Sequence, residues 1–341
     1  MVVIAAHPAG RPPIRHRAAP LPTIGHVTSP AAFSAGSAAD GALILDGGMS
    51  NELEARGHDL RDDLWSARLL RDAPQEIAAV HRTYYQAGAV VATTASYQAS
   101  VEGFVRAGAE PEQARRLIRR SVQVARDVRD ELAADGRIRW VAASVGPYGA
   151  VLADGSEYRG RYGLSAAQLR DFHLPRLELL AAAGPDVLAV ETIPDADEAE
   201  VLVNALDGLG LPAWLSYTVD GDRTRAGQPL AEAFAVASGS DAVVAAGVNC
   251  CAPGDVAEAV AVARAVSGLP AVAYPNRGEE WDGRAAGWVG SGSFDVAMAE
   301  GWVAAGATCV GGCCRVGPAD IADLTAALDA SGRIGHGRTQ P

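Results

Sequence analysis

A pattern that repeats from residue 42 onward constrains the fold most strongly. A short apolar run, often β-branched, ends in Gly, Ser, Thr or Asn and is followed by an amphipathic stretch rich in Ala, Leu, Glu and Arg. Such runs predict strands, and the stretches between them have helical periodicity. Strands are expected at 42–48, 90–97, 140–145, 186–193, 213–219, 242–250, 271–276 and 308–314. The clearest helices are expected at 112–134, 166–183, 197–206, 255–266 and 319–328.

Eight strand–helix units that follow one another without a linker favour a single α/β domain, a closed (β/α)8 or TIM barrel. An open doubly wound sheet is the alternative. In a barrel of this kind the active site lies at the carboxyl ends of the strands. The polar residue that closes each apolar run is therefore the first place to look for function.

The two ends of the chain differ from this pattern. Residues 1–40 are rich in Pro, Ala, His and Arg and have neither periodicity, so we expect a flexible N-terminal extension. The short apolar run at 2–6 is too brief for the apolar core of a signal peptide, which takes about 7–15 residues. The barrel is expected over 41–330, and a flexible tail over 331–341.

Charge and cysteine content narrow the class of protein. The 29 basic and 41 acidic residues give a net charge of −12, which makes nucleic acid and anionic membranes poor partners. No apolar stretch reaches the roughly 18–20 residues of a membrane helix. Neither a G-x-G-x-x-G nor a P-loop motif occurs, so no nucleotide cofactor is indicated. We expect a cytoplasmic protein, and a monomer because no exposed apolar helix face stands out.

Three of the five cysteines close strands. The sixth run ends in Gly247-Val248-Asn249-Cys250 and the eighth in Gly311-Gly312-Cys313-Cys314. Thiolate is a soft ligand that zinc prefers, and three protein ligands leave the fourth tetrahedral position open for catalysis. We therefore predict a Zn2+ site at the carboxyl mouth of the barrel. The alternative, that cysteines are small buried hydrophobes, is our reading of Cys251 and Cys309. A redox pair of adjacent cysteines would be strained.

Two carboxylates occupy equivalent positions at strand ends. Asp46 precedes Gly47 and Gly48 in the first unit, and Glu191 lies in Val190-Glu191-Thr192-Ile193 of the fourth. A carboxylate buried there needs a cation or hydrogen-bond donors, and a substrate ammonium would serve. The backbone N–H groups of Gly47 and Gly48 could receive a substrate carboxylate. Alternatively, Asp46 caps the helix that begins near Ser50, and Glu191 pairs with an arginine of the barrel.

Taken together, these segments resemble the homocysteine S-methyltransferase family, and most closely its branch that uses S-methylmethionine or S-adenosylmethionine. The resemblance spans residues 42 to about 328. It includes five further segments: Asn51-Glu52-Leu53-Glu54, Thr93-Thr94-Ala95-Ser96-Tyr97-Gln98-Ala99-Ser100, Ser144-Val145-Gly146-Pro147-Tyr148-Gly149-Ala150, Asp154-Gly155-Ser156-Glu157-Tyr158-Arg159-Gly160, and Tyr274-Pro275-Asn276. It implies a zinc ion held by Cys250, Cys313 and Cys314. It also implies that Asp46 and Glu191 hold the substrate amino group and that amides at Gly47 and Gly48 hold its carboxylate.

The resemblance implies methyl transfer from a small cationic donor to homocysteine, giving methionine. The loop from Tyr148 to Tyr162 is similar to the donor-side loop of that branch. Trp65, Tyr97, Tyr148, Tyr158 and Trp281 could cradle an onium ion, although aromatic residues are more often part of a core. The N-terminal extension is longer than the family pattern requires.

Other functions are compatible with the sequence. Betaine could replace the sulfonium donor, whereas methyl-folate is disfavoured because no second domain is left for a pterin. A zinc-free barrel lyase or hydrolase would use Asp46 and Glu191 as acid and base, and its activity would survive removal of zinc. A non-catalytic zinc-storing or redox-sensing barrel would use Cys313 and Cys314 as a switch.

Overall fold

The structure is a computed structural model that describes residues 41–60, 64–282 and 287–335. Eight parallel strands form one sheet in the order β1-β12-β9-β8-β5-β4-β3-β2. They are β1 (Leu43–Ile44), β2 (Val91–Thr93), β3 (Trp140–Val145), β4 (Val187–Ile193), β5 (Ala213–Tyr217), β8 (Val243–Asn249), β9 (Ala271–Tyr274) and β12 (Ala307–Val310). A parallel bridge from Leu45 to Val91 joins the two ends of the sheet. The (β/α)8 barrel is confirmed, and the open sheet is excluded.

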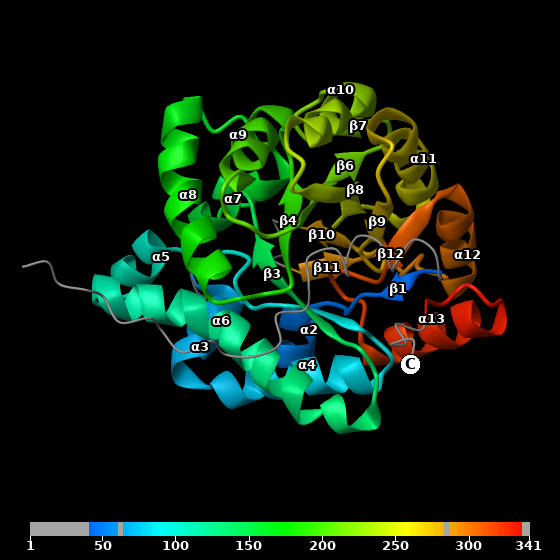
Figure 1. Cartoon of the computed structure of the whole chain (residues 1–341), viewed down its shortest axis with the longest axis horizontal. Helices are drawn as coiled ribbons and strands as arrows, with labels where there is room; N and C mark the ends of the chain where they lie inside the picture. The colour runs from blue at the N-terminus through cyan, green and yellow to red at the C-terminus, as the bar shows by residue number, and fades with distance from the viewer. Residues whose placement is uncertain (1–40, 61–63, 283–286, 336–341) are drawn as a thin grey trace, which may run out of the picture.

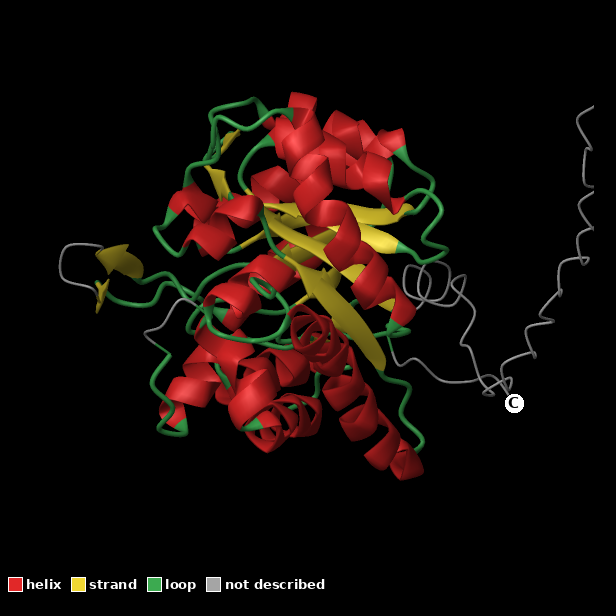
Figure 2. Ribbon diagram, turned by 90° about the vertical axis from the view of Figure 1, so that its left-hand side faces the viewer, coloured by secondary structure: helices red, strands yellow, loops and turns green. Residues whose placement is uncertain are grey.

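Helices surround the strands on all sides (Figures 1 and 2). They are α2 (Met49–Ala55), α3 (Leu69–Asp72), α4 (Pro74–Gln86), α5 (Val101–Arg106), α6 (Pro111–Glu131), α7 (Tyr148–Leu152), α8 (Ala166–Ala182), α9 (Ala196–Leu206), α10 (Leu230–Ala235), α11 (Val256–Ser267), α12 (Val296–Ala305) and α13 (Pro318–Ala330). Short 3-10 turns are found at Trp65–Arg68, Ala133–Asp135, Ser156–Tyr158, Val236–Gly239 and Pro253–Asp255. The five helices expected from the sequence correspond to α6, α8, α9, α11 and α13.

Each of the eight predicted runs contains a strand, but most strands end before the polar residues that close the run. Those residues lie instead in the first turn of the following loop. Two hairpins were not predicted: β6 (Val219–Asp220) with β7 (Arg223–Thr224), and β10 (Glu280–Asp282) with β11 (Gly287–Val289). Both hairpins follow barrel strands and are built from two or three residues a strand, too few to give a periodic signal.

The strands are buried on both faces, which explains why their sequences are nearly continuous apolar runs. Leu43 and Leu45 belong to a cluster of buried residues drawn from the strands, whereas Ile44 belongs to the larger cluster shared with the helices. Cys309 lies in the first cluster and Cys251 in the second, and both are fully or almost fully buried. Their surroundings fit the reading of these two cysteines as small core residues.

The predicted extension at 1–40 lies outside the described residues, as does 336–341. Residues 331–335, expected in the flexible tail, are instead attached to the start of the barrel. Ala42 N donates to Arg333 O at 2.7 Å, and Ala42 and Ile334 form a parallel bridge. The barrel therefore extends beyond residue 330. Residues 333–335 provide hydrogen-bonding partners for the backbone of Ala42, which precedes β1. In the described part of the chain, no helix combines the length and apolar character needed to cross a membrane.

Candidate metal and substrate site

A cavity of about 500 Å3 opens at the carboxyl ends of the barrel strands. Among the residues that line it are Asp46, Thr93, Ser144, Glu191, Cys250 and Cys313. These six residues come from six different barrel strands, and each lies close to the carboxyl end of its strand; β5 and β9 contribute none of the six. The structure therefore brings together the strand-closing residues that the sequence singled out.

Three thiols meet in this cavity. The Sγ atom of Cys250 lies 3.1 Å from that of Cys313 and 3.5 Å from that of Cys314. Within the described ranges, these three residues form the single group of three or more potential ligands whose donor atoms all approach within 4.8 Å. Cys250 is buried, and the other two cysteines are half-buried at the cavity wall. Three sulfur atoms at this spacing could hold one metal ion.

Cys250 owes its position to the end of β8. Its φ angle of +52° lies in the left-handed region, which non-glycine residues seldom adopt. The backbone is fixed there from both sides, because Cys250 N donates to Tyr274 O at 3.3 Å and Thr218 Oγ1 donates to Cys250 O at 3.0 Å. The strained turn directs the thiol toward β12, as expected where local strain serves a site.

Cys313 and Cys314 follow a turn in which only glycine fits. A Cβ atom on Gly312 would lie 2.2 Å from Val316 Cγ1, and one on Gly311 would lie 2.6 Å from Leu45 Cβ. The loop that follows β9 accepts hydrogen bonds from both cysteines and so fixes their backbone. Cys313 N donates to Pro275 O at 2.7 Å, and Cys314 N donates to Asn276 Oδ1 at 3.1 Å.

The thiols alter one another's acidity. Hydrogen bonds from Cys250 and Cys313 lower the pKa of Cys314, whereas the same kind of contact, together with burial, raises the pKa of Cys313. The thiolate form of Cys314 is thus stabilised by hydrogen bonds from the thiols of Cys250 and Cys313. A further polar neighbour of the cluster is Tyr158, whose hydroxyl lies 3.4 Å from Cys250 Sγ.

Asp46 lies at the end of β1 and is almost fully buried. Its two oxygens accept hydrogen bonds from Thr93, at 2.6 Å from the backbone N and at 2.9 Å from Oγ1. Burial, with a smaller contribution from the charge of Glu191, nevertheless raises the pKa of Asp46 to about 8. The helix-capping alternative is wrong, since the N-cap of α2 is Gly48 and no side chain caps that helix.

Glu191 lies within β4 and accepts hydrogen bonds from Ser144 Oγ and, at 3.0 Å, from Tyr274 OH. Burial raises the pKa of Glu191 to about 7, and the nearby Cys250 contributes. No ion pair joins Glu191 to an arginine of the described residues, so the alternative of a barrel ion pair is also wrong. Two buried carboxyl groups thus face one cavity with hydrogen-bond donors but without a positive charge.

The paired glycines after Asp46 serve packing. A Cβ on Gly47 would lie 2.4 Å from Val316 O, and one on Gly48 would lie 2.8 Å from Cys313 O. The N–H of Gly48 already donates to Val316 O at 2.9 Å, so it is not available to a ligand in this conformation. No acceptor among the described residues takes the N–H of Gly47.

Glu157 is a half-buried charged residue of the cavity to which no sequence pattern assigned a role. Glu157 lines the wall close to Cys250, and its Oε2 atom is buried without a hydrogen-bond partner. Burial raises the pKa of Glu157 to about 7. The D-G-S-E-Y segment could have drawn attention to it, but no periodicity indicates that a loop glutamate turns inward.

Of the aromatic residues proposed for an onium ion, Trp65, Tyr97 and Tyr158 line the cavity. Tyr148 is not among the lining residues and packs against Tyr162 and Phe172. The side chain of Trp281 lies outside the described part of the structure.

Known proteins are similar to this chain in sequence and in fold. The sequence model of the family described as Homocysteine S-methyltransferase matches residues 43–328. The chain belongs to the homocysteine S-methyltransferase family. The homocysteine S-methyltransferase of Escherichia coli K12 is 45% identical over 292 residues, covering 83% of this chain and 94% of that protein. Homocysteine S-methyltransferase 4 of Zea mays is 44% identical over 308 residues, covering 85% and 90%.

A solved structure of a relative supports this family membership, because it has the same fold. The metallated form of the homocysteine methyltransferase MmuM from E. coli is 42% identical, with a TM-score of 0.77 over 85% of this chain and 97% of that one. The present chain is therefore a methyltransferase of the homocysteine S-methyltransferase family, on the barrel that the sequence predicted.

Proposed function

We propose that this enzyme is a zinc-dependent homocysteine S-methyltransferase that takes a methyl group from a sulfonium donor, S-methylmethionine or S-adenosylmethionine, and forms methionine. One observation carries the proposal. Three thiols and two buried carboxyl groups without a cationic partner face the same cavity. Such a cavity suits a metal ion beside an amino acid that carries a positive charge.

The three cysteines fit a metal ion. Their sulfurs are close enough to share one ligand, and an all-sulfur set favours zinc over harder cations. When bound by Cys250, Cys313 and Cys314, zinc would supply an open position at which a substrate thiol is deprotonated near neutral pH. The relative from E. coli is described as metallated, which supports the presence of a metal in this family.

Asp46 and Glu191 are proposed to hold the ammonium group of homocysteine. A substrate cation between them would offset the burial that now raises both pKa values. Because Asp46, Glu191 and the three cysteines line one cavity, the side chain of an amino acid held this way could reach the thiols. The free N–H of Gly47 is proposed to receive the carboxylate, and Gly48 to act through packing alone.

Glu157 is proposed to face the donor. Its buried, unpaired oxygen needs a positive charge, and a sulfonium provides one without a proton to lose. Trp65, Tyr97 and Tyr158 would add aromatic surface of the kind that attracts an onium ion. In the reaction the homocysteine sulfur, having lost its proton to water, forms a bond to the methyl carbon. The bond to the donor sulfur breaks, and the donor leaves as a neutral thioether.

The test is methionine formation from homocysteine with S-methylmethionine, S-adenosylmethionine or betaine in separate assays, before and after zinc is stripped and restored. We expect methionine from a sulfonium donor, loss of activity on chelation and recovery with zinc. Activity that survives complete removal of metal would reject zinc dependence. Turnover with betaine alone would replace the sulfonium donor and leave the acceptor unchanged.

We further propose that the enzyme is cytoplasmic and that it is a monomer. The first is tested by fractionation of cells, and the second by light scattering of the purified protein at several concentrations. A redox-sensing barrel without catalysis is disfavoured by membership of an enzyme family, and it would be supported by reversible loss of thiols with no turnover of homocysteine.

A further inference from the structure

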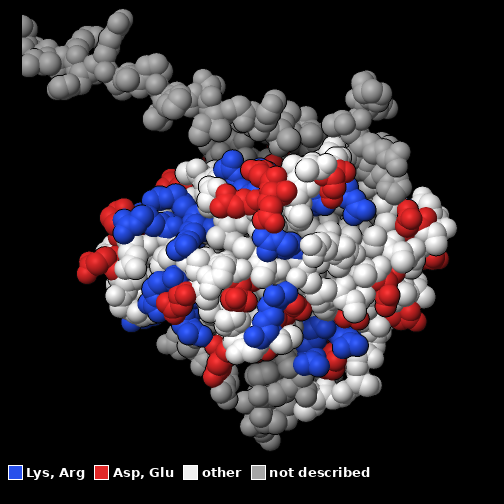
Figure 3. All heavy atoms as spheres, turned by 90° about the horizontal axis from the view of Figure 1, so that it is seen from below, with Lys and Arg blue, Asp and Glu red and all other residues white. Residues whose placement is uncertain are grey.

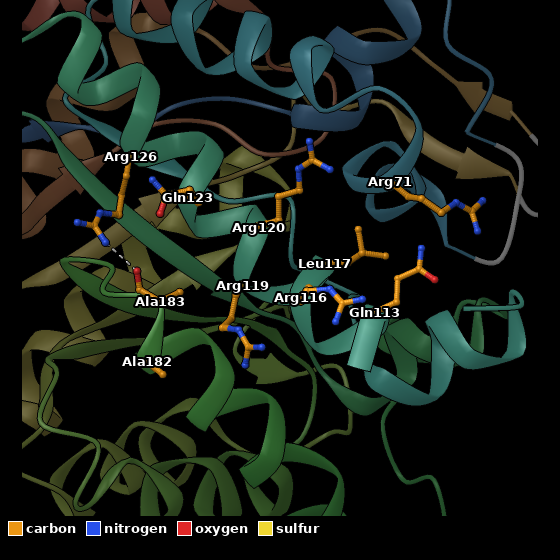
Figure 4. Close-up of a pocket in the computed structure, with 10 residues that line it drawn as sticks. All are labelled: Arg71, Gln113, Arg116, Leu117, Arg119, Arg120, Gln123, Arg126, Ala182 and Ala183. Atoms are coloured by element: carbon orange, nitrogen blue, oxygen red, sulfur yellow. Dashed lines mark hydrogen bonds between the residues drawn. The ribbon is translucent and has the colours of Figure 1, made fainter. Parts of the chain in front are cut away.

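A second hollow, of about 740 Å3, lies outside the reaction cavity, and no residue lines both. Helix α6 forms most of its wall, and the carboxyl end of α8 contributes Ala182 and Ala183. The wall contains no carboxylate and five arginines: Arg71, Arg116, Arg119, Arg120 and Arg126. Figure 4 shows these side chains spread across the hollow, with Arg126 at the left, Arg71 at the right and the other three between them. We call this hollow the arginine groove.

Two of the arginines have structural roles. Arg126 donates to Ala183 O at 2.9 Å and so satisfies a carbonyl at the end of α8. Arg71 pairs with Asp72 at 2.7 Å. These contacts fix both ends of the groove and leave the middle to Arg116, Arg119 and Arg120.

The three central arginines form no ion pair with a carboxylate of the described residues. Elsewhere on α6 the arginines are paired, as Arg115 is with Glu112 at 3.3 Å and Arg129 with Asp186 at 2.9 Å. Like charges three and four residues apart destabilise a helix. The clustering is unexpected in a chain of net charge −12 that contains no lysine. Figure 3, which views the underside of the molecule, shows one larger group of basic side chains at the left and smaller groups, mixed with acidic side chains, over the rest of the face.

We propose that the arginine groove binds a short chain of phosphates, either inorganic triphosphate or the triphosphate of a nucleotide. Guanidinium groups bind phosphate oxygens in a bidentate fashion and stay charged at all physiological pH values. Arg116 and Arg120 are about 6 Å apart along the helix axis, so the groove presents several charges to one extended anion.

The other lining residues restrict the ligand further. The apolar ones are Leu117, Ala182 and Ala183, and no aromatic ring is present on which a base could stack. The phosphates, and not the base, are therefore the recognised part. A long polyanion such as nucleic acid is disfavoured, because the acidic remainder of the surface would repel whatever extends beyond the groove.

The test is calorimetric titration of the full-length, metal-loaded enzyme at about 50 mM salt with inorganic triphosphate, ATP and inorganic monophosphate. We expect both triphosphates to bind at least tenfold more tightly than monophosphate, with affinity falling as salt rises. Equal affinities for triphosphate and ATP would identify the phosphate chain as the recognised part. Tighter binding of ATP would contradict recognition of the phosphates alone and would make the nucleoside part of the ligand. Metal content is measured after each titration, since triphosphates chelate divalent cations.

A charge-matched pair of variants separates the groove from general electrostatics. The triple variant R116Q/R119Q/R120Q should lose at least tenfold in triphosphate affinity. The control R115Q/R170Q/R223Q removes the same charge from outside the groove and should bind as the unaltered enzyme does. Both should retain methyl transfer, because neither touches the reaction cavity. Absence of triphosphate binding to the unaltered enzyme, or equal losses in the two variants, would overturn the proposal.

Discussion

At the scale of single residues, burial in the cavity disfavours the ionised forms of its two acids, Asp46 and Glu191, in the absence of substrate. Asp46 and Glu191 have raised pKa values because each loses solvation on burial and gains only hydrogen bonds in return. In this cavity the hydrogen-bond donors do not offset the burial of the two carboxylates. The cavity is therefore prepared for a cation, and its affinity should depend on which acids are ionised.

Replacing Asp46 with Asn should raise KM for homocysteine about tenfold or more and change kcat less, because an ammonium contact is lost while Thr93 can still bond to the side chain. Steady-state kinetics would show this split. The exposed acid Asp323 on α13 provides the control, since Asp323→Asn should leave both constants unchanged. An unaltered KM in D46N would remove Asp46 from the amino-group site.

The pKa values also predict two opposite pH dependences. For the free protein, acids whose folded pKa is raised favour folding when protonated, so this contribution to stability is lost as pH rises from about 4 to about 8. Binding of an ammonium needs the ionised acids and should therefore strengthen as pH rises through about 7 to 8. Titration with methionine, which has no thiol to ionise, isolates this effect, and a binding constant flat between pH 6 and 9 would contradict it.

Glu157→Gln should raise KM for the sulfonium donor about tenfold and leave KM for homocysteine nearly unchanged, because the carboxylate is proposed to face the donor. Kinetics with each substrate varied in turn would separate the two. A change confined to homocysteine would place Glu157 on the acceptor side instead.

At the scale of elements, the close packing of β8 against β9 holds the thiols in register. A Cβ on Gly247 would lie 1.9 Å from Val272 O, so Gly247→Ala must push the two strands apart. We expect a loss of about 1–3 kcal/mol in the free energy of unfolding, the usual range for overpacking. Gly254→Ala is the matched control, because a Cβ added there would have no neighbour within 4 Å. Equal denaturation curves for the two variants would contradict this account.

The elements also show what the sequence could and could not predict. All eight strands were recognised because strands buried on both faces become continuous apolar runs, and the same runs pointed to Asp46, Glu191 and the three cysteines at their ends. The contact of Tyr158 with the cysteines and the inward position of the Glu157 carboxyl were not predicted, because both residues lie in a short 3-10 turn that has no periodic signal. The contact of Tyr158 with Cys250 spans 92 positions along the chain. No local pattern encodes a contact over that distance.

At the scale of the whole molecule, closure of the barrel depends on short contacts. The strand β1 has two residues, and the sheet closes between Leu45 and Val91. The segment after α13 supports this junction, since Gly335 N donates to Ala42 O at 3.0 Å. Few hydrogen bonds therefore hold the first strand in place, and those from residues 333–335 form a substantial part of them.

Truncation after Ala330 should lower the melting temperature by several degrees, since it removes the backbone partners of Ala42. Truncation after Gly335 keeps those partners and serves as the control. Differential scanning calorimetry of both, at equal metal content, would measure the difference. Identical melting temperatures would mean that β1 is held by the barrel alone.

The pairing of Ala42 with Ile334 brings the two ends of the barrel to one place. Circular permutation follows from this geometry: a short linker could join residue 335 to residue 41, and new termini could be opened at the exposed glycines of Gly208-Leu209-Gly210. In such a rearranged chain the three cysteines would emerge from the ribosome early instead of last. The order in which the barrel is synthesised could thus be separated from the architecture that it finally adopts.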